Sequence, residues 1–122
     1  MKKTWIFNKT DDNSAELLLY GSISDESWFG DEVTPQQFLA ELKALGDVKN
    51  VTVRINSPGG DVFAALAISS ILRDHPANIT ALIDGYCASA ATIIPAFADK
   101  SQASANSMFV IHNTSTIYRC YW

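Results

Sequence analysis

Residues 54–61 read Arg-Ile-Asn-Ser-Pro-Gly-Gly-Asp, and this stretch decides the fold. It continues the β-branched run at 51–55 and precedes an apolar helical pattern over residues 61–73, which Pro76 ends. A proline followed by two glycines predicts a tight turn, because glycine adopts positive φ without steric cost. The stretch therefore predicts a strand, a turn and a helix in immediate succession.

Strands and helices alternate beyond this stretch. Residues 79–83 and 108–111 are further apolar, largely β-branched runs that predict strands. Residues 89–98 predict a helix in which Pro95 costs about 3 kcal/mol or introduces a kink. Because such alternation indicates βαβ units, we expect the runs at 51–55, 79–83 and 108–111 to share one parallel sheet.

The segment before the turn predicts a hairpin and a further helix. Residues 3–9 and 15–23 alternate apolar and polar side chains around an Asp-Asp-Asn-Ser turn, which favours two antiparallel strands. After a loop, Thr34 fits the N-cap of a helix, and Gln37 can complete a capping box with it. Gly46 is a typical helix stop.

The composition indicates one globular domain over residues 1–122. The chain is 48% hydrophobic, and its net charge of −4 includes no block of basic residues. We therefore expect no nucleic acid partner, because binding to phosphates needs a basic surface. The longest apolar run, at residues 87–98, is too short and too often interrupted by polar residues to span a bilayer, so we expect no membrane partner.

The N-terminal residues and the cysteines indicate a cytoplasmic protein without a cofactor. Two lysines follow Met1, but polar residues occupy positions 8–14, where a signal peptide would have its apolar core. Cys87 and Cys120 form neither a metal-ligand spacing nor a disulfide framework. Because no phosphate-binding glycine loop is present either, we expect neither a metal nor a cofactor.

Three chemically useful points lie where predicted strands end. The Pro-Gly-Gly turn can aim backbone amides, including that of Gly60, at developing negative charge. Ser89 opens a predicted helix among alanines, which leave room for a substrate carbonyl, and the amide of Ala90 is next to it. His112 ends the run at 108–111 and can serve as a general base. Together they supply the parts of an acyl-transfer site.

Each point taken singly has a more ordinary interpretation. A Pro-Gly-Gly sequence is most often only a turn, Ser89 belongs to a residue type that caps helices, and His112 can be a hydrogen-bonded strand end. His75, beside Pro76 at a predicted helix end, is interpreted as structural. Only the combination favours catalysis.

The combination resembles the ClpP peptidase family. The matching motifs are Asn56-Ser57-Pro58-Gly59-Gly60, Gly85-x-x-Ala88-Ser89 and Val110-Ile111-His112, and the resemblance extends over residues 17–113. It implies an α/β fold of the ClpP/crotonase type, built from repeated β-β-α units with a parallel sheet. It also implies a serine endopeptidase that forms an acyl-enzyme on Ser89, with His112 as the base and the amides of Gly60 and Ala90 as the oxyanion hole.

The resemblance also implies partners. Family members form homo-oligomeric rings, act on polypeptide substrates and work with an ATP-driven unfoldase, and they need no cofactor. Residues 61–65 and 85–92 are most similar to the ClpP-related head maturation proteases of phages and prophages, which process capsid or scaffold proteins. A capsid protein is therefore an alternative partner.

One expected residue has no counterpart. Family members continue past the histidine, through a long helix, to an aspartate that orients it, whereas this sequence ends ten residues after His112. Four aspartates precede the histidine, and none matches the family's; they are Asp61, Asp74, Asp84 and Asp99. We therefore expect a fold that is incomplete at the C-terminus, as in a truncated protein, and a catalytically inactive assembly module or fragment is the alternative function.

Two other reaction classes remain open. A CoA-thioester enzyme of the crotonase type would share the fold and its glycine amides, but no carboxylate is suitably placed for its chemistry. A serine–lysine peptidase would need a lysine base, and Lys100 has no positional support for that role.

Overall fold

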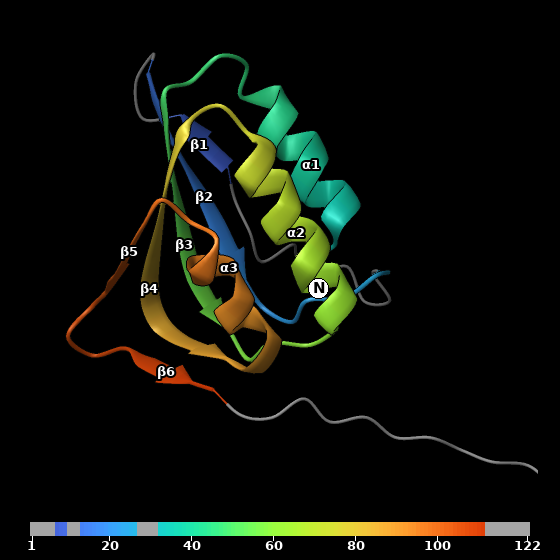
Figure 1. Ribbon diagram of the computed structural model, residues 1–122, viewed down its shortest axis with the longest axis vertical. Coiled ribbons are helices and arrows are strands. Elements are labelled where there is room, and N and C mark those ends of the chain that lie inside the picture. The colour runs from blue at the N-terminus through green and yellow to red at the C-terminus, as the bar shows by residue number, and fades with distance from the viewer. Residues whose placement is uncertain (1–6, 10–12, 27–31, 112–122) are drawn as a thin grey trace, which may run out of the picture.

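The computed structural model describes residues 7–9, 13–26 and 32–111, which form strands, helices and one 3₁₀ turn (Figure 1). In chain order the elements are β1 Phe7–Lys9, β2 Ser14–Tyr20, α1 Pro35–Ala44, β3 Asn50–Ser57, α2 Val62–Asp74, β4 Asn78–Ala88, the 3₁₀ turn η1 Ser89–Thr92, α3 Ile93–Ala96, β5 Lys100–Ala103 and β6 Met108–Val110. The order confirms the predicted alternation of strands and helices.

The strands form one sheet in the order β1-β2-β3-β4-β5, with β6 also paired to β4. The pairs β2–β3, β3–β4, β4–β5 and β4–β6 are parallel, whereas β1 and β2 form the predicted antiparallel hairpin. The runs at 51–55, 79–83 and 108–111 therefore share a parallel sheet as predicted. β5 follows the first half of β4 and β6 follows its last residues along the same edge.

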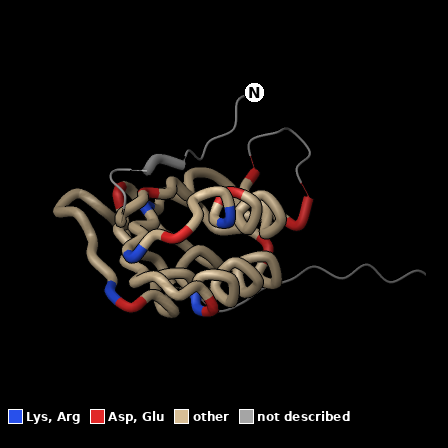
Figure 2. Tube along the Cα trace, turned by 90° about the horizontal axis from the view of Figure 1, so that it is seen from above, with Lys and Arg blue, Asp and Glu red and all other residues tan. Residues whose placement is uncertain are grey.

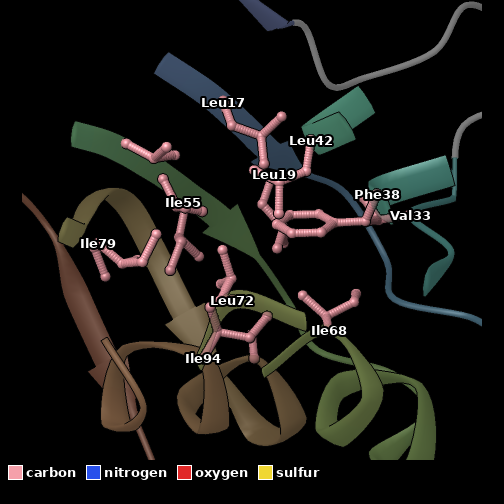
Figure 3. Close-up of a cluster of buried hydrophobic side chains, with 14 of the residues drawn as sticks. Leu17, Leu19, Val33, Phe38, Leu42, Ile55, Ile68, Leu72, Ile79 and Ile94 are labelled. Carbon is pink, nitrogen blue, oxygen red and sulfur yellow. The ribbon is translucent and has the colours of Figure 1, made fainter. Parts of the chain in front are cut away.

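Helices α1, α2 and α3 cover one face of the sheet, and the core fills the space between (Figures 1 and 3). Every second residue of β2 and β3 is buried, as expected for strands with one covered face. The helices contribute the apolar stripes that complete this layer. The largest buried side chains include Leu17, Leu19, Phe38, Ile55, Ile68, Leu72 and Ile94.

Side-chain caps begin both long helices. The Thr34 hydroxyl accepts a hydrogen bond from the Gln37 amide at 3.3 Å, so the predicted N-cap is confirmed. The reciprocal half of the capping box is absent, because the buried Gln37 Oε1 has no hydrogen-bond partner among the described residues. At α2, the Asp61 carboxylate accepts from the Ala64 amide at 2.9 Å.

The structure differs from the prediction between residues 84 and 103. β4 continues to Ala88 instead of ending near Ile83, and the expected helix at 89–98 is divided into η1 and the four-residue α3. Pro95 lies in the first turn of α3, where an amide has no intrahelical partner to lose. β5 was not predicted, because its sequence Lys-Ser-Gln-Ala is polar and exposed throughout.

Charged residues of both signs are interspersed along the described chain (Figure 2). Within the same described part, no helix has the length and apolarity needed to cross a membrane.

The uncovered face of the sheet carries an ion-pair cluster across three strands. Arg54 of β3 donates from Nε and Nη2 to the two carboxylate oxygens of Asp84, each at 2.8 Å. Tyr20 donates its hydroxyl to the same carboxylate at 2.5 Å, and Glu16 lies 3.5 Å from Arg54. The guanidinium of Arg54 therefore holds the pKa of Asp84 below its usual range.

This cluster predicts a pH dependence of stability. Because the folded-state pKa of Asp84 is depressed, its contribution is present above the unfolded-state value of about 3.9 and is lost as the pH falls through the folded-state pKa. We expect Asp84→Asn to lower the melting temperature near neutral pH and to flatten its decline below about pH 4, as measured by circular dichroism. The exposed Asp74→Asn is the control, and its melting temperature should fall with decreasing pH as that of the parent does. An Asp84→Asn variant whose melting temperature falls as steeply as the parent's would contradict the prediction.

Candidate active site

The Pro-Gly-Gly turn after β3 adopts the predicted left-handed backbone. Gly59 has φ +98° and Gly60 has φ +143°. The amide of Ile23 donates to Gly59 O at 2.9 Å, and Ile23 O accepts from the Asp61 amide at 3.0 Å. Gly60 lies between these two bonds, and its own amide takes part in neither and makes no hydrogen bond within the described residues. The amide is therefore available to a ligand.

Ser57 fixes the shape of this turn from inside. Its buried hydroxyl donates to Gly21 O at 2.6 Å and accepts from the Gly59 amide at 3.1 Å. The Gly59 amide is thereby used within the turn, which leaves that of Gly60 as the free donor. The motif Asn-Ser-Pro-Gly-Gly thus specifies which amide is unpaired.

Ser89 lies at the junction between β4 and η1 in an unusual conformation. Its φ of +56° is the only positive value of a non-glycine residue in the described ranges 7–9, 13–26 and 32–111. Such a conformation costs on the order of 1–3 kcal/mol and is concentrated at functional sites. The sequence did not reveal it, because the motif lacks the glycine spacing of a nucleophile elbow and only the folded backbone sets this angle.

The alternative role of Ser89 as a helix cap is wrong. The residue at the N-cap of η1 is Ala88, and no side chain caps this turn. Within the described part of the chain, the Ser89 hydroxyl forms no hydrogen bond, while its carbonyl accepts from the Thr92 hydroxyl at 2.7 Å. The hydroxyl is therefore not used by the local structure.

The turn and the Ser89 segment, about thirty residues apart in sequence, are in direct backbone contact. A Cβ atom added at Gly59 would collide with Ala88 O and would lie 2.9 Å from Ser89 Cβ and 3.0 Å from Ala90 N. The amide of Ala90 is at the start of η1, where amides have no intrahelical acceptor. The structure thus brings Ser89 and Ala90 against Gly59, the residue before Gly60, while the roles expected of Gly60, Ser89 and Ala90 stay predictions.

β6 extends along β4 towards Ser89. Val110 pairs with Ala88, the residue before Ser89, and Ile111 is the last residue that the structure describes in this segment. His112 lies outside the described residues, so its role as a base stays a prediction.

Two other titratable residues, Lys100 and His75, lie elsewhere in the fold. Lys100 begins β5 and pairs with Thr80, so most of the length of β4 separates that pair from Ser89. His75 ends α2, and its Nδ1 accepts from the Ala77 amide at 3.1 Å, as expected for a structural histidine. Lys100 is therefore not placed to act as a base for Ser89.

Three of the four aspartates noted in the sequence serve the fold. Asp61 caps α2, Asp84 pairs with Arg54, and Asp99 Oδ2 accepts from the Ile79 amide at 2.8 Å. Asp74 is exposed at the end of α2. Within the described residues, no group of three or more His, Cys, Asp or Glu side chains could hold a metal ion.

Cys87 is two residues before Ser89 but faces the core. It is fully buried, and burial raises the pKa of its thiol to about 12. Because a thiolate is the reactive form of cysteine, Cys87 is protonated and unreactive near neutral pH.

Two glycines with positive φ test the packing of the turn. A Cβ atom at Gly60 would collide with Ile23 O, whereas one at Gly46, with φ +71°, would meet nothing within 4 Å. We expect Gly60→Ala to reduce the free energy of unfolding by about 1–3 kcal/mol more than Gly46→Ala does. Urea denaturation of both variants measures this difference, and equal losses would argue against the tight packing of Gly60 on Ile23.

The buried thiol gives a second expectation. Iodoacetamide at pH 8 should leave Cys87 unmodified in the folded protein and alkylate it in urea, because unfolding exposes the thiol and returns its pKa towards the usual value. Mass mapping of the peptide that contains Cys87 distinguishes it from Cys120. Alkylation of the folded chain as fast as the unfolded chain would show that the thiol is accessible.

The sequence is similar to a known protein family and to several of its members. The model of the family described as Clp protease matches residues 8–120. The ATP-dependent Clp protease proteolytic subunit 2 of Treponema denticola is 33% identical over 116 residues, which cover 86% of this chain and 56% of that protein. Subunit 3 of Streptomyces coelicolor is 33% identical over 110 residues, which cover 86% of this chain and 51% of that protein. The chain therefore spans about half the length of the curated relatives it matches.

Solved structures show the same similarity. The ClpP protease catalytic domain from Plasmodium falciparum superposes with a TM-score of 0.68 at 25% identity and covers 80% of this chain and 53% of its own. A ClpP1 mutant from Listeria monocytogenes gives a TM-score of 0.58 at 26% identity and covers 68% of this chain and 46% of its own. The α/β fold with its parallel sheet is thus that of the ClpP catalytic domain, and the chain belongs to the Clp protease family.

Proposed function

We propose that this chain carries the catalytic serine of a ClpP-type serine endopeptidase. The observation that carries the proposal is the position of Ser89, whose backbone is left-handed and whose Cβ lies against Gly59. Two amides without acceptors within the described chain, those of Gly60 and Ala90, belong to the residues that directly follow Gly59 and Ser89. A nucleophile next to unpaired donors is the arrangement that acyl transfer needs.

The proposed reaction proceeds through an ester on Ser89. Its Oγ attacks the carbonyl carbon of a peptide bond while His112 takes the hydroxyl proton, and the Gly60 and Ala90 amides donate to the oxyanion. Collapse of the tetrahedral intermediate breaks the C–N bond, and His112 returns the proton to the departing amine. Water, deprotonated by His112, then attacks the ester carbonyl, the bond from the carbonyl carbon to Ser89 Oγ breaks, and His112 returns the proton to Oγ.

His112 is proposed as the base from its position in the sequence. It follows Val110 by two residues, and Val110 pairs with the residue immediately before Ser89. No residue of the 122 matches the family's orienting aspartate. In chymotrypsin-type enzymes, disabling that residue lowers kcat by about 10⁴. We therefore expect the 122-residue polypeptide by itself to turn over peptide substrates slowly.

The proposed partners are a polypeptide substrate, further copies of the chain and an ATP-driven unfoldase. The relatives from Treponema denticola and Streptomyces coelicolor are named as ATP-dependent proteolytic subunits, which supports the unfoldase. Exposed apolar side chains support self-association, among them Phe63 at 80%, Ile111 at 72% and Met108 at 63% of their full exposure. The similarity of residues 61–65 and 85–92 to phage head maturation proteases makes a capsid or scaffold protein the narrower substrate to test.

The same exposed residues favour a second candidate, an assembly module that does not turn over substrate. Such a module would form oligomers without acylation of Ser89. The reactivity of Ser89 therefore decides between the two functions.

We expect a fluorophosphonate probe to label the folded chain on Ser89, because such probes need only an activated serine and oxyanion donors. Ser89→Ala should abolish labelling, and His112→Ala should slow it at least about tenfold. The exposed Ser70→Ala on α2 is the matched control and should be labelled like the parent. Mass mapping of the adduct identifies the residue.

Two results would overturn the peptidase proposal. The first is labelling of Ser89→Ala at the rate of the parent, which would place the nucleophile elsewhere. The second is a folded, oligomeric parent chain that is not labelled at all, which would favour the assembly module.

A further inference from the structure

The pairing of β3 and β4 is interrupted directly beside the site. The strands are in register up to the pair Ile55–Ile83, and pairing resumes at Ser57–Cys87. One residue of β3, Asn56, therefore faces three residues of β4, at 84–86. This is a bulge with two extra residues on β4, and it explains why β4 loses its alternating burial there.

The side chain of Asn56 spans the bulge. Its Oδ1 accepts a hydrogen bond from the Tyr86 amide at 3.1 Å, where the bulge has removed the backbone partner. Its backbone carbonyl accepts from the Gly21 amide at 3.1 Å, so the residue is held on both neighbouring strands. The side chain of Asn56 thus supplies the hydrogen-bond acceptor that the backbone of β3 would otherwise offer to the Tyr86 amide.

Gly85 makes room for this side chain. A Cβ atom at Gly85 would collide with Asn56 Oδ1, and no other residue is among its nearest neighbours. Gly85 does not have positive φ, so its backbone conformation is open to other residues. The need for glycine at this position therefore comes from the Asn56 side chain.

We propose that Asn56 is a positioning residue that sets the place of the Gly60 amide relative to Ser89, an inference that rests on the proposed role of Ser89. Asn56 is the second-last residue of β3, just before the turn that contains Gly60, and its partner Tyr86 is three residues before Ser89. The bond between them fixes the offset of the two strand ends that meet at the Gly59–Ser89 contact. Without this hydrogen bond, the bulge allows the C-terminal end of β4 to shift relative to that of β3.

The expected signature is a loss of reactivity that exceeds the loss of stability. Tyr86 is exposed, so water can satisfy its amide in Asn56→Ala, and unfolding should become easier by about 1 kcal/mol or less. Labelling of Ser89 by the fluorophosphonate should fall by about 10- to 100-fold, because misplacement by about 1 Å can cost that much. The control is Asn50→Ala, which removes a cross-strand Asn50–Asn78 bond at the other end of the same strands and should label like the parent.

A double variant separates positioning from general damage. Gly85→Ala should slow labelling about as much as Asn56→Ala, because the added methyl group displaces the amide side chain. In the Asn56→Ala background the same Gly85→Ala change should have no further effect. Additive losses, or Asn56→Ala labelled at the parent's rate while the parent reacts, would overturn the inference and leave the proposed function intact.

Hydrogen exchange of the Tyr86 amide gives a readout that does not depend on activity. We expect protection at Tyr86 in the parent and at least about tenfold faster exchange in Asn56→Ala, with amides of α1 unchanged. If the parent itself is not labelled, the proposed function fails. The exchange rate of the Tyr86 amide then tests by itself whether the Asn56 side chain holds the bulge. Unchanged protection of Tyr86 in Asn56→Ala would overturn it.

Discussion

The contact between the backbone of Gly59 and the segment 88–90 is the constraint on which the candidate site depends. It can form only because residue 59 has no side chain and because β3 and β4 run parallel, so that their C-terminal ends meet at the same edge of the sheet. The hydrogen bonds of Ser57 and Ile23 hold the turn in the shape that this contact needs. The remaining elements supply the rigid layer from which the two strand ends project.

That layer is stabilised differently on its two faces. The covered face is a continuous apolar core shared by the sheet and three helices. On the uncovered face, the pair Arg54–Asp84 joins β3 to the first residue of the bulge in β4, and Tyr20 of β2 bonds to the same carboxylate. Because the Arg54–Asp84 pair is partly exposed, its net contribution to stability is modest, and the cluster also fixes the relative position of the three strands.

Sequence patterns were sufficient where local chemistry decides the structure. The hairpin, the Thr34 cap and the parallel runs at 51–55 and 79–83 follow from alternation, capping residues and β-branched composition. Ser89 and Ala90 also lie against Gly59 of the motif turn. These features depend on residues close to one another in the sequence or on a parallel order that βαβ alternation imposes.

Features that depend on tertiary pairing could not be predicted. β5 has a polar sequence and becomes a strand only because β4 offers it an edge. The bulge at 84–86 and the bond from Asn56 to Tyr86 require knowledge of the β3–β4 register, which no single strand encodes. The left-handed angle of Ser89 arises in the same way, from a strand end that must turn into η1 while it stays against Gly59.

The backbone angle of Ser89 also bears on how this position can vary. Glycine would adopt φ +56° without the steric penalty that serine meets, so a glycine here would suit the backbone better than the residue that is present. A residue that makes the fold less stable than another residue would is typical of sites where activity and stability conflict. In a lineage that no longer used the hydroxyl, drift at position 89 would favour glycine, and the residue found at this position in related chains would distinguish working peptidases from those that keep only the fold.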